Sequence, residues 1–146
     1  LLLQLAAEMG ALPPGSGRAR DEAAAVFADP DLSWIFHPES VGGRGLCEVP
    51  IVLARVDGQG REERLTGVID RLIVRPERLD IVDYKTNRWG GDPARRDELV
   101  AHYRPQLEAY AAAVTALYPG RPVRTWLLLT DPAGRGGGES GLCPLS

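Results

Sequence analysis

Residues 79–85, Leu-Asp-Ile-Val-Asp-Tyr-Lys, have the composition of a buried β-strand but carry charged side chains near its end. Two longer runs rich in Val, Ile and Leu precede it, at residues 48–56 and 64–74, and each is typical of a strand. The connecting segments, residues 57–60 and 75–78, are short and contain the Gly, Pro and Asp of tight turns. Because short connections join antiparallel neighbours, the three runs predict an antiparallel meander.

A helix and a fourth strand follow the meander. Apolar residues recur at helical spacing from Leu107 to Tyr118, with Pro105 expected near the start and Pro119-Gly120 at the stop. Residues 123–129 read as a further strand, apolar enough to lie inside the sheet. The sequence therefore predicts an α/β domain, with a central mixed sheet flanked by helices.

The two ends of the chain carry weaker signals. Residues 1–9 predict a helix that ends at Gly10, residues 13–17 a loop, and residues 20–28 a second helix. Since the chain begins inside a helical pattern, we expect a piece of a longer protein. We expect one domain over residues 1–131 and, because residues 134–138 are nearly all glycine, a flexible tail over residues 132–146.

Composition narrows the class of protein. The chain has 146 residues, 44% hydrophobic and 25% charged, which fits one globular domain whose core needs no disulfide or metal. Its two cysteines, Cys47 and Cys143, are expected to be free thiols and exclude a zinc ribbon or a four-cysteine cluster within the chain. No stretch approaches the roughly 18 apolar residues of a membrane span, so no membrane partner is expected and the localisation is expected to be cytoplasmic. The net charge of −3 argues against a histone-like nucleic-acid coat but not against a nuclease.

Three acidic residues and a lysine form the candidate site. Asp83 and Lys85 are two apart on a strand, so they share a face with their roots about 6.6–6.8 Å apart. Asp70 and Asp83 are equidistant from the turn at 75–78, which predicts opposed carboxylates with Cβ atoms about 4.5–5.5 Å apart. Such a pair is tolerated if one member is protonated or if a cation such as Mg²⁺ or Mn²⁺ lies between them. Glu48 starts the neighbouring strand and can reach the same end of the sheet. The alternative to a metal site is a salt bridge in which Lys85, the only lysine of the chain, merely neutralises Asp83.

Three segments in order, Gly-Val-Ile-Asp-Arg-Leu at 67–72, Asp-Ile-Val-Asp-Tyr-Lys-Thr-Asn at 80–87 and Gln-Leu-Glu-Ala-Tyr at 106–110, resemble a known set of motifs. They are similar to those of the PD-(D/E)xK nuclease superfamily, specifically the C-terminal nuclease domain of AddA/RecB-type helicase-nucleases, and the resemblance covers about residues 48–130. It implies a restriction-endonuclease-like fold and a metal-dependent DNA exonuclease of double-strand break repair and recombination. The site residues that it implies are Glu48, Asp70 and Asp83 as acidic ligands, the Tyr84 carbonyl as a further metal ligand, Lys85 as the catalytic lysine, and Gln106 with Tyr110 beside them.

The resemblance also implies what lies outside this chain. The expected cofactor is Mg²⁺, for which Mn²⁺ can substitute, and the expected partners are DNA, a helicase motor in the parent chain and a partner helicase-nuclease subunit. The family's metal-binding histidine precedes a Leu-Leu-Gln run, which here opens the chain, so that histidine is expected upstream; His37 and His102 are expected to be structural or exposed. No Gly-x-x-x-x-Gly-Lys-Ser/Thr loop occurs, so ATP binding is not expected in this piece.

Two other interpretations stay open. One is a DNA-binding or scaffolding fragment of the same fold without activity. The other is a stand-alone RecB-like exonuclease of the CRISPR-associated kind, against which the presence of only two cysteines counts. Five arginines are candidates for holding the DNA strand, with a solvated surface position as the alternative for each: Arg71, Arg88, Arg95, Arg96 and Arg104.

Overall fold

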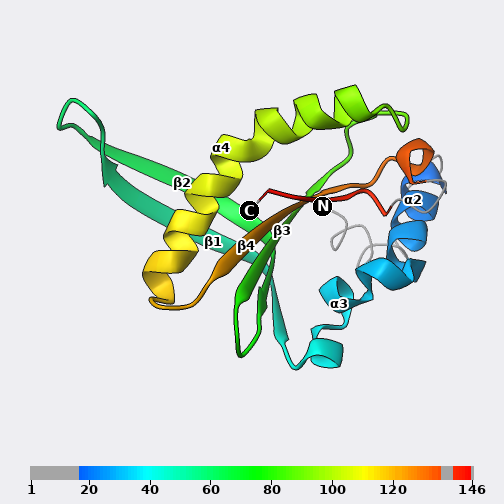
Figure 1. Ribbon diagram of the computed structural model, residues 1–146, viewed down its shortest axis with the longest axis horizontal. Coiled ribbons are helices and arrows are strands. Elements are labelled where there is room, and N and C mark those ends of the chain that lie inside the picture. The colour runs from blue at the N-terminus through cyan, green and yellow to red at the C-terminus, as the bar shows by residue number, and fades with distance from the viewer. Residues whose placement is uncertain (1–16, 136–139, 146) are drawn as a thin grey trace.

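The computed structural model describes residues 17–135 and 140–145, which form a mixed α/β domain (Figure 1). The predicted fold class is confirmed. Its helices are α2 (Gly17–Ala28), α3 (Ser33–Phe36) and α4 (Pro93–Leu117), and its strands are β1 (Arg44–Val56), β2 (Glu62–Val74), β3 (Leu79–Lys85), β4 (Val123–Leu129) and β5 (Leu142–Pro144), with short 3₁₀ helices at Pro30–Leu32, Pro38–Val41 and Pro132–Gly134.

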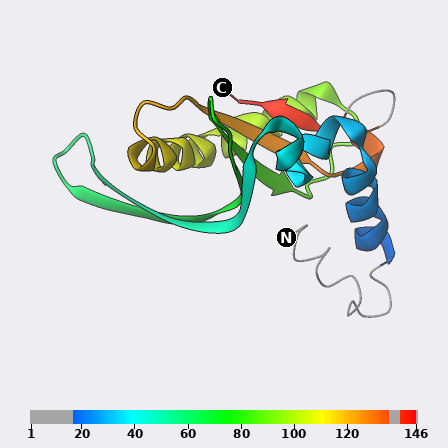
Figure 2. The same ribbon diagram turned by 90° about the horizontal axis from the view of Figure 1, so that it is seen from below.

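The five strands lie in the order β1-β2-β3-β4-β5. Strands β1, β2 and β3 form the predicted antiparallel meander, and the register of β2 on β3, with Val74 opposite Leu79, is the one that the turn at 75–78 predicts. Helix α4 crosses over from β3 to β4, which are parallel. Because β4 lies between β3 and β5, it is interior, as predicted. Figures 1 and 2 show the β1–β2 hairpin extending well beyond the other strands.

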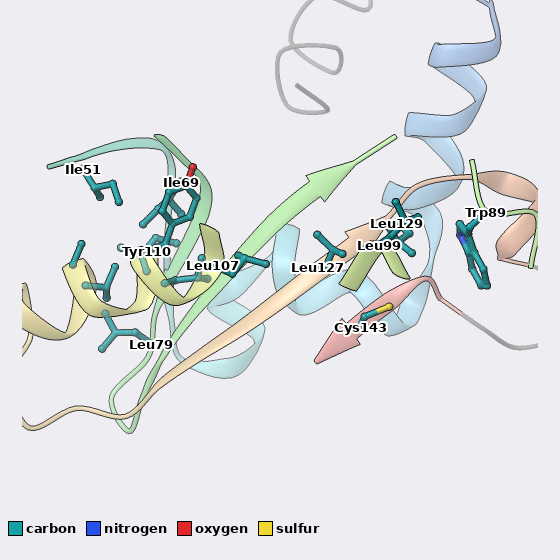
Figure 3. Close-up of a cluster of buried hydrophobic side chains, with 14 residues drawn as sticks. Ile51, Ile69, Leu79, Trp89, Leu99, Leu107, Tyr110, Leu127, Leu129 and Cys143 are labelled. Carbon is teal, nitrogen blue, oxygen red and sulfur yellow. The ribbon is translucent and has the colours of Figure 1, made fainter. Parts of the chain in front are cut away.

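Each face of the sheet has its own apolar cluster. On one face, Leu107 and Tyr110 of α4 turn toward strand residues such as Ile69 and Leu127 (Figure 3). On the other face, residues of α2 and α3 pack against the even-numbered residues of β3, Val82 and Tyr84. Because strand side chains alternate, the odd-numbered Asp83 and Lys85 are placed on the α4 side.

Helix α4 corrects one boundary of the prediction. It begins at Pro93 rather than near Pro105, which lies inside it. The start is fixed by Asp92, whose side chain accepts a hydrogen bond from the Ala94 N–H, and by a proline at the first helical position, where no N–H is required. Pro105 is exposed, so the carbonyl that it leaves without an intrahelical donor can be hydrated.

The tail prediction for residues 132–146 is wrong where the structure describes it. Strand β5 pairs antiparallel with β4, Cys143 is buried in the α4-side cluster, and Gly134 lies against the Trp89 ring. Three residues are too few to show a periodic pattern, so a strand of this length gives no signal in the sequence. The helix expected over residues 1–9 and most of the following loop lie outside the described residues, whereas the helix expected over 20–28 is confirmed as α2.

Two further expectations can be compared with the described residues. Cys47 and Cys143, both within the described residues, are thiols that take no part in a disulfide, as predicted. Within residues 17–135 and 140–145, none of the helices is long and apolar enough to span a bilayer.

Candidate active site

The site lies where β2 separates from β3. The ladder between them ends at the pair Arg71–Val82, one step short of the two aspartates. In place of further ladder bonds, the Tyr84 N–H donates to Oδ2 of Asp70 at 2.8 Å. The predicted register is therefore correct, but Asp70 is held by the backbone of β3 through its side chain rather than paired directly with Asp83.

Asp83 is a buried carboxylate with an incomplete set of partners. Its residue exposure is 3%, and its Oδ2 lies 2.8 Å from the Lys85 Nζ. Burial raises the pKa of Asp83 to about 6; Lys85 offsets part of this effect, and the nearby Asp70 carboxylate adds to it. Oδ2 is also among the buried side-chain atoms that lack a partner in hydrogen-bonding geometry within the described part of the chain. The site thus holds a negative charge that the described residues stabilise only in part.

Lys85 is fixed from two sides. Besides Asp83, its Nζ lies 4.5 Å from the centroid of the Tyr103 ring on α4, within the range of a cation–π contact. Burial lowers the pKa of Lys85, but the hydrogen bond to Asp83 and the charges of Asp83 and Asp70 together outweigh burial and leave the pKa above its ordinary value. Tyr103 is not among the predicted site residues, although it lies three and seven positions before Gln106 and Tyr110 and so shares their face of the helix.

Gln106 and Tyr110 form one wall of the site. The Gln106 Nε2 donates to the Tyr110 hydroxyl at 3.0 Å. A Cβ on Gly67 of β2 would lie 2.8 Å from a Tyr110 ring carbon, so glycine is required for the ring to approach the strand. Burial raises the pKa of Tyr110, and Asp83 raises it further, which places this hydroxyl in the field of the carboxylates.

Glu48 occupies the position on β1 opposite Asp70, but the two do not pair. The ladder pairs Cys47 with Arg71 and Val49 with Ile69, and Glu48 between them has a left-handed backbone with φ +50°. Among the described residues, no group of three or more His, Cys, Asp and Glu surrounds a point where a metal could sit. The structure therefore brings Asp70 and Asp83 together without Glu48 as a third carboxylate, and its role as a ligand stays a prediction.

The donor set still fits a divalent cation. Mg²⁺ and Mn²⁺ prefer oxygen ligands and commonly bind through one or two carboxylates with the remaining positions taken by water or substrate phosphate. Asp83 offers a buried oxygen without an aligned donor, and Asp70 lies close enough to raise the pKa of Asp83. A cation between the two would relieve their repulsion. The Tyr84 carbonyl remains a predicted ligand.

The arginines predicted to hold DNA divide into two groups. Arg71 is buried at 8% exposure and donates to the Ile35 carbonyl and to Cys47 Sγ, so it braces α3 against the sheet. Neither the predicted DNA contact nor the alternative of a solvated surface position fits this burial. Arg88 is more exposed but is held between Glu22 and Asp131. The other three also contact protein groups, which are Glu98 for Arg95, Asp97 for Arg96 and the Leu145 carbonyl for Arg104.

The two histidines lie outside the site, as expected. The His37 side chain is 69% exposed and faces Glu39, and His102 is exposed on α4. Neither is placed as a metal ligand.

Comparisons with known proteins agree with this geometry. A model of the PD-(D/E)XK nuclease superfamily matches residues 17–139. Similar curated proteins are the A subunits of ATP-dependent helicase/nucleases: that of Streptococcus sanguinis is 32% identical over 106 residues, which is 72% of this chain and 8% of the relative. That of Desulforudis audaxviator is 43% identical over 70 residues, 47% of this chain and 6% of the relative. The chain thus spans less than a tenth of the length of these relatives.

Proposed function

Because the chain belongs to the PD-(D/E)XK nuclease superfamily, we propose that it is a metal-dependent DNA exonuclease that hydrolyses phosphodiester bonds. The observation that carries the proposal is the buried Asp83, whose Oδ2 contacts the only lysine of the chain and lacks an aligned donor. A purely structural carboxylate on the same strand, Asp80, is instead surrounded by Arg75, Arg78 and the Trp126 indole N–H. Asp83 is therefore the less fully neutralised of the two carboxylates, since it faces one lysine and the Asp70 carboxylate rather than two arginines.

The proposed chemistry divides the work among the site residues. Asp70 and Asp83, with Glu48 and the Tyr84 carbonyl as further predicted ligands, would hold Mg²⁺ or Mn²⁺, which when bound polarises the phosphate and lowers the pKa of water. Lys85 orients the attacking water and stabilises the negative charge that develops on phosphorus oxygens. A compact ammonium suits this position better than a planar guanidinium.

The biological setting is part of the proposal. The similarity to these helicase/nucleases supports a nuclease module that acts with a helicase motor in the parent chain and with a partner helicase-nuclease subunit. Such a module would serve double-strand break repair and recombination in the cytoplasm. This chain contributes no Gly-x-x-x-x-Gly-Lys-Ser/Thr loop, so the energy of ATP would be used elsewhere in the assembly.

The direct test is cleavage of labelled DNA, with the label at an end of the linear substrates and within the strand of the circular one. Single-stranded, linear double-stranded and closed circular DNA are each incubated with the protein in Mg²⁺, in Mn²⁺ and in EDTA. We expect shortening of linear DNA with either metal, none in EDTA, and none of circular DNA, since an exonuclease requires an end. Asp83→Ala and Lys85→Ala serve as inactive controls whose melting shows that they fold. DNA binding without cleavage by the parent protein under every metal would instead identify an inactive binding module.

A further inference from the structure

We propose that Tyr103 is a positioning residue for the nuclease reaction: its ring face holds the Lys85 ammonium in the site independently of Asp83. The inference rests on the proposed function for its catalytic meaning. It rests on the described contacts for its geometry.

Lys85 needs an anchor because its side chain is long. A lysine side chain is a flexible four-carbon stem, so a single contact leaves the ammonium many arrangements. Here Nζ lies 2.8 Å from Asp83 Oδ2 and 4.5 Å from the Tyr103 centroid. The first contact comes from its own strand and the second from α4, and together they fix the ammonium between sheet and helix.

The two anchors differ in what else they can bind. The Asp83 oxygen that contacts Lys85 lies in a buried carboxylate, so a divalent cation that binds this carboxylate competes with Lys85 for it. A carboxylate that coordinates a divalent cation attracts a neighbouring ammonium less strongly, and the divalent cation and the ammonium repel each other. An aromatic face attracts an ammonium through its quadrupole and offers no carboxylate oxygen for the metal. Tyr103 can therefore keep Lys85 in place when Asp83 is occupied.

The ring is itself held in position. The Tyr103 hydroxyl donates to Asn87 Oδ1 at 3.1 Å, and Asn87 lies two residues after Lys85 on the same chain segment. The ring also forms a T-shaped pair with the His102 ring, with centroids 4.7 Å apart. Ring and hydroxyl thus have separable roles: the ring contacts the ammonium, and the hydroxyl ties α4 to the end of β3.

The first experiment reads the contact directly, without metal or DNA. Since Lys85 is the only lysine, protein grown with ¹³C-lysine gives one set of lysine side-chain NMR signals. Above a ring face, the Lys85 ε-methylene protons should shift upfield from their position in free lysine. We expect the upfield shift in the parent and in Tyr103→Phe, and its loss in Tyr103→Leu. An unshifted signal in the parent, or an unchanged shift in Tyr103→Leu, would overturn the contact.

The second experiment tests the consequence for cleavage. With Mg²⁺ and labelled DNA, Tyr103→Leu should lower kcat roughly two- to thirtyfold, the rate equivalent of a cation–π contact, with KM for DNA changed less than about twofold. Tyr103→Phe should restore most of kcat. Tyr118→Leu, the same substitution just beyond the end of α4 and away from the site, should leave kcat at the parent value.

The two experiments separate the failure of this inference from that of the proposed function. If the parent protein does not cleave DNA, the proposed function fails while the NMR signal still decides whether Tyr103 holds Lys85. If the parent cleaves and Tyr103→Leu cleaves equally fast with its upfield shift lost, the positioning role is refuted and the nuclease stands. The parent signal needs no variant, so the contact remains testable even if Tyr103→Leu folds poorly.

Discussion

Replacing Asp83 by asparagine distinguishes a site built for a cation from a buried structural ion pair. Burial raises the pKa of Asp83 from 3.8 to about 6, even with Lys85 beside it. This difference corresponds to roughly 3 kcal/mol by which the charged carboxylate destabilises the metal-free fold at neutral pH. Asparagine has nearly the same shape as aspartate without the charge, so Asp83→Asn should raise the free energy of unfolding by up to that amount, or roughly 6–12 °C in Tm for a domain of this size.

The pH dependence has a defined sign. Because the pKa of Asp83 is raised in the folded state, the folded protein holds the proton more tightly than the unfolded chain does. The stability that the protonated carboxyl gives is fully present below about pH 4 and is lost as the pH rises through about 6. Thermal unfolding in EDTA should therefore show a large difference between Asp83→Asn and the parent at pH 7.5, which shrinks toward pH 4.

Asp80 supplies the matched control. It lies on the same strand and is fully buried, but Arg75 and Arg78 lie 2.9 and 3.0 Å from its Oδ2. Asp80→Asn breaks a buried pair, which typically costs about 3–5 kcal/mol, so it should melt lower than the parent. If Asp83→Asn also melts lower in EDTA at pH 7.5, Asp83 is a structural ion-pair residue and the cation-site reasoning fails.

Three further outcomes test the site. Lys85→Arg should fold and bind DNA but not cleave it, because a planar guanidinium cannot replace the ammonium; cleavage at the parent rate would show that any positive charge suffices. Free Mg²⁺ at ten times its Kd should stabilise the parent by about 1.4 kcal/mol, or roughly 3–6 °C in Tm. Asp70→Asn should abolish most of this rise in Tm, and a parent insensitive to both Mg²⁺ and Mn²⁺ would contradict the metal site. Gly67→Ala would place its Cβ 2.8 Å from a Tyr110 ring carbon, so it should cost about 1–3 kcal/mol and slow cleavage, while Gly58→Ala, with open space around its Cβ, should do neither.

The sheet and its register could be predicted because they depend on local signals. Composition identifies β3, and the four-residue turn at 75–78 sets which residues of β2 oppose it, since register follows turn length. That rule brings Asp70 and Asp83 into one site. Local signals fail for β5, whose three residues form a strand only because β4 offers them an edge. They also fail for Pro105, because its tolerance inside α4 depends on an exposure that only the packed structure defines.

Glu48 shows why the third carboxylate could not be placed. Strict alternation would put Leu46 and Val49, three residues apart, on opposite faces of β1, yet both pack against the α4-side cluster. The left-handed backbone of Glu48 between them resets the alternation. Positive φ at a residue other than glycine is costly and is rarely foreseen from sequence, so a face assignment by counting residues fails at this point.

The same reset explains why a site forms here. Ile69 and Leu72 of β2 also share the α4-side cluster although they are three apart, so both strands of the hairpin change phase at the step that contains Glu48 and Asp70. The ladder between β2 and β3 ends at the same step, which leaves the Tyr84 N–H free for the Asp70 side chain. A regular sheet would pair this N–H with a backbone carbonyl and would pack the hairpin without interruption. The break in the ladder therefore frees a backbone donor to fix Asp70, keeps Asp83 buried beside it, and leaves both carboxylates within the field of one lysine.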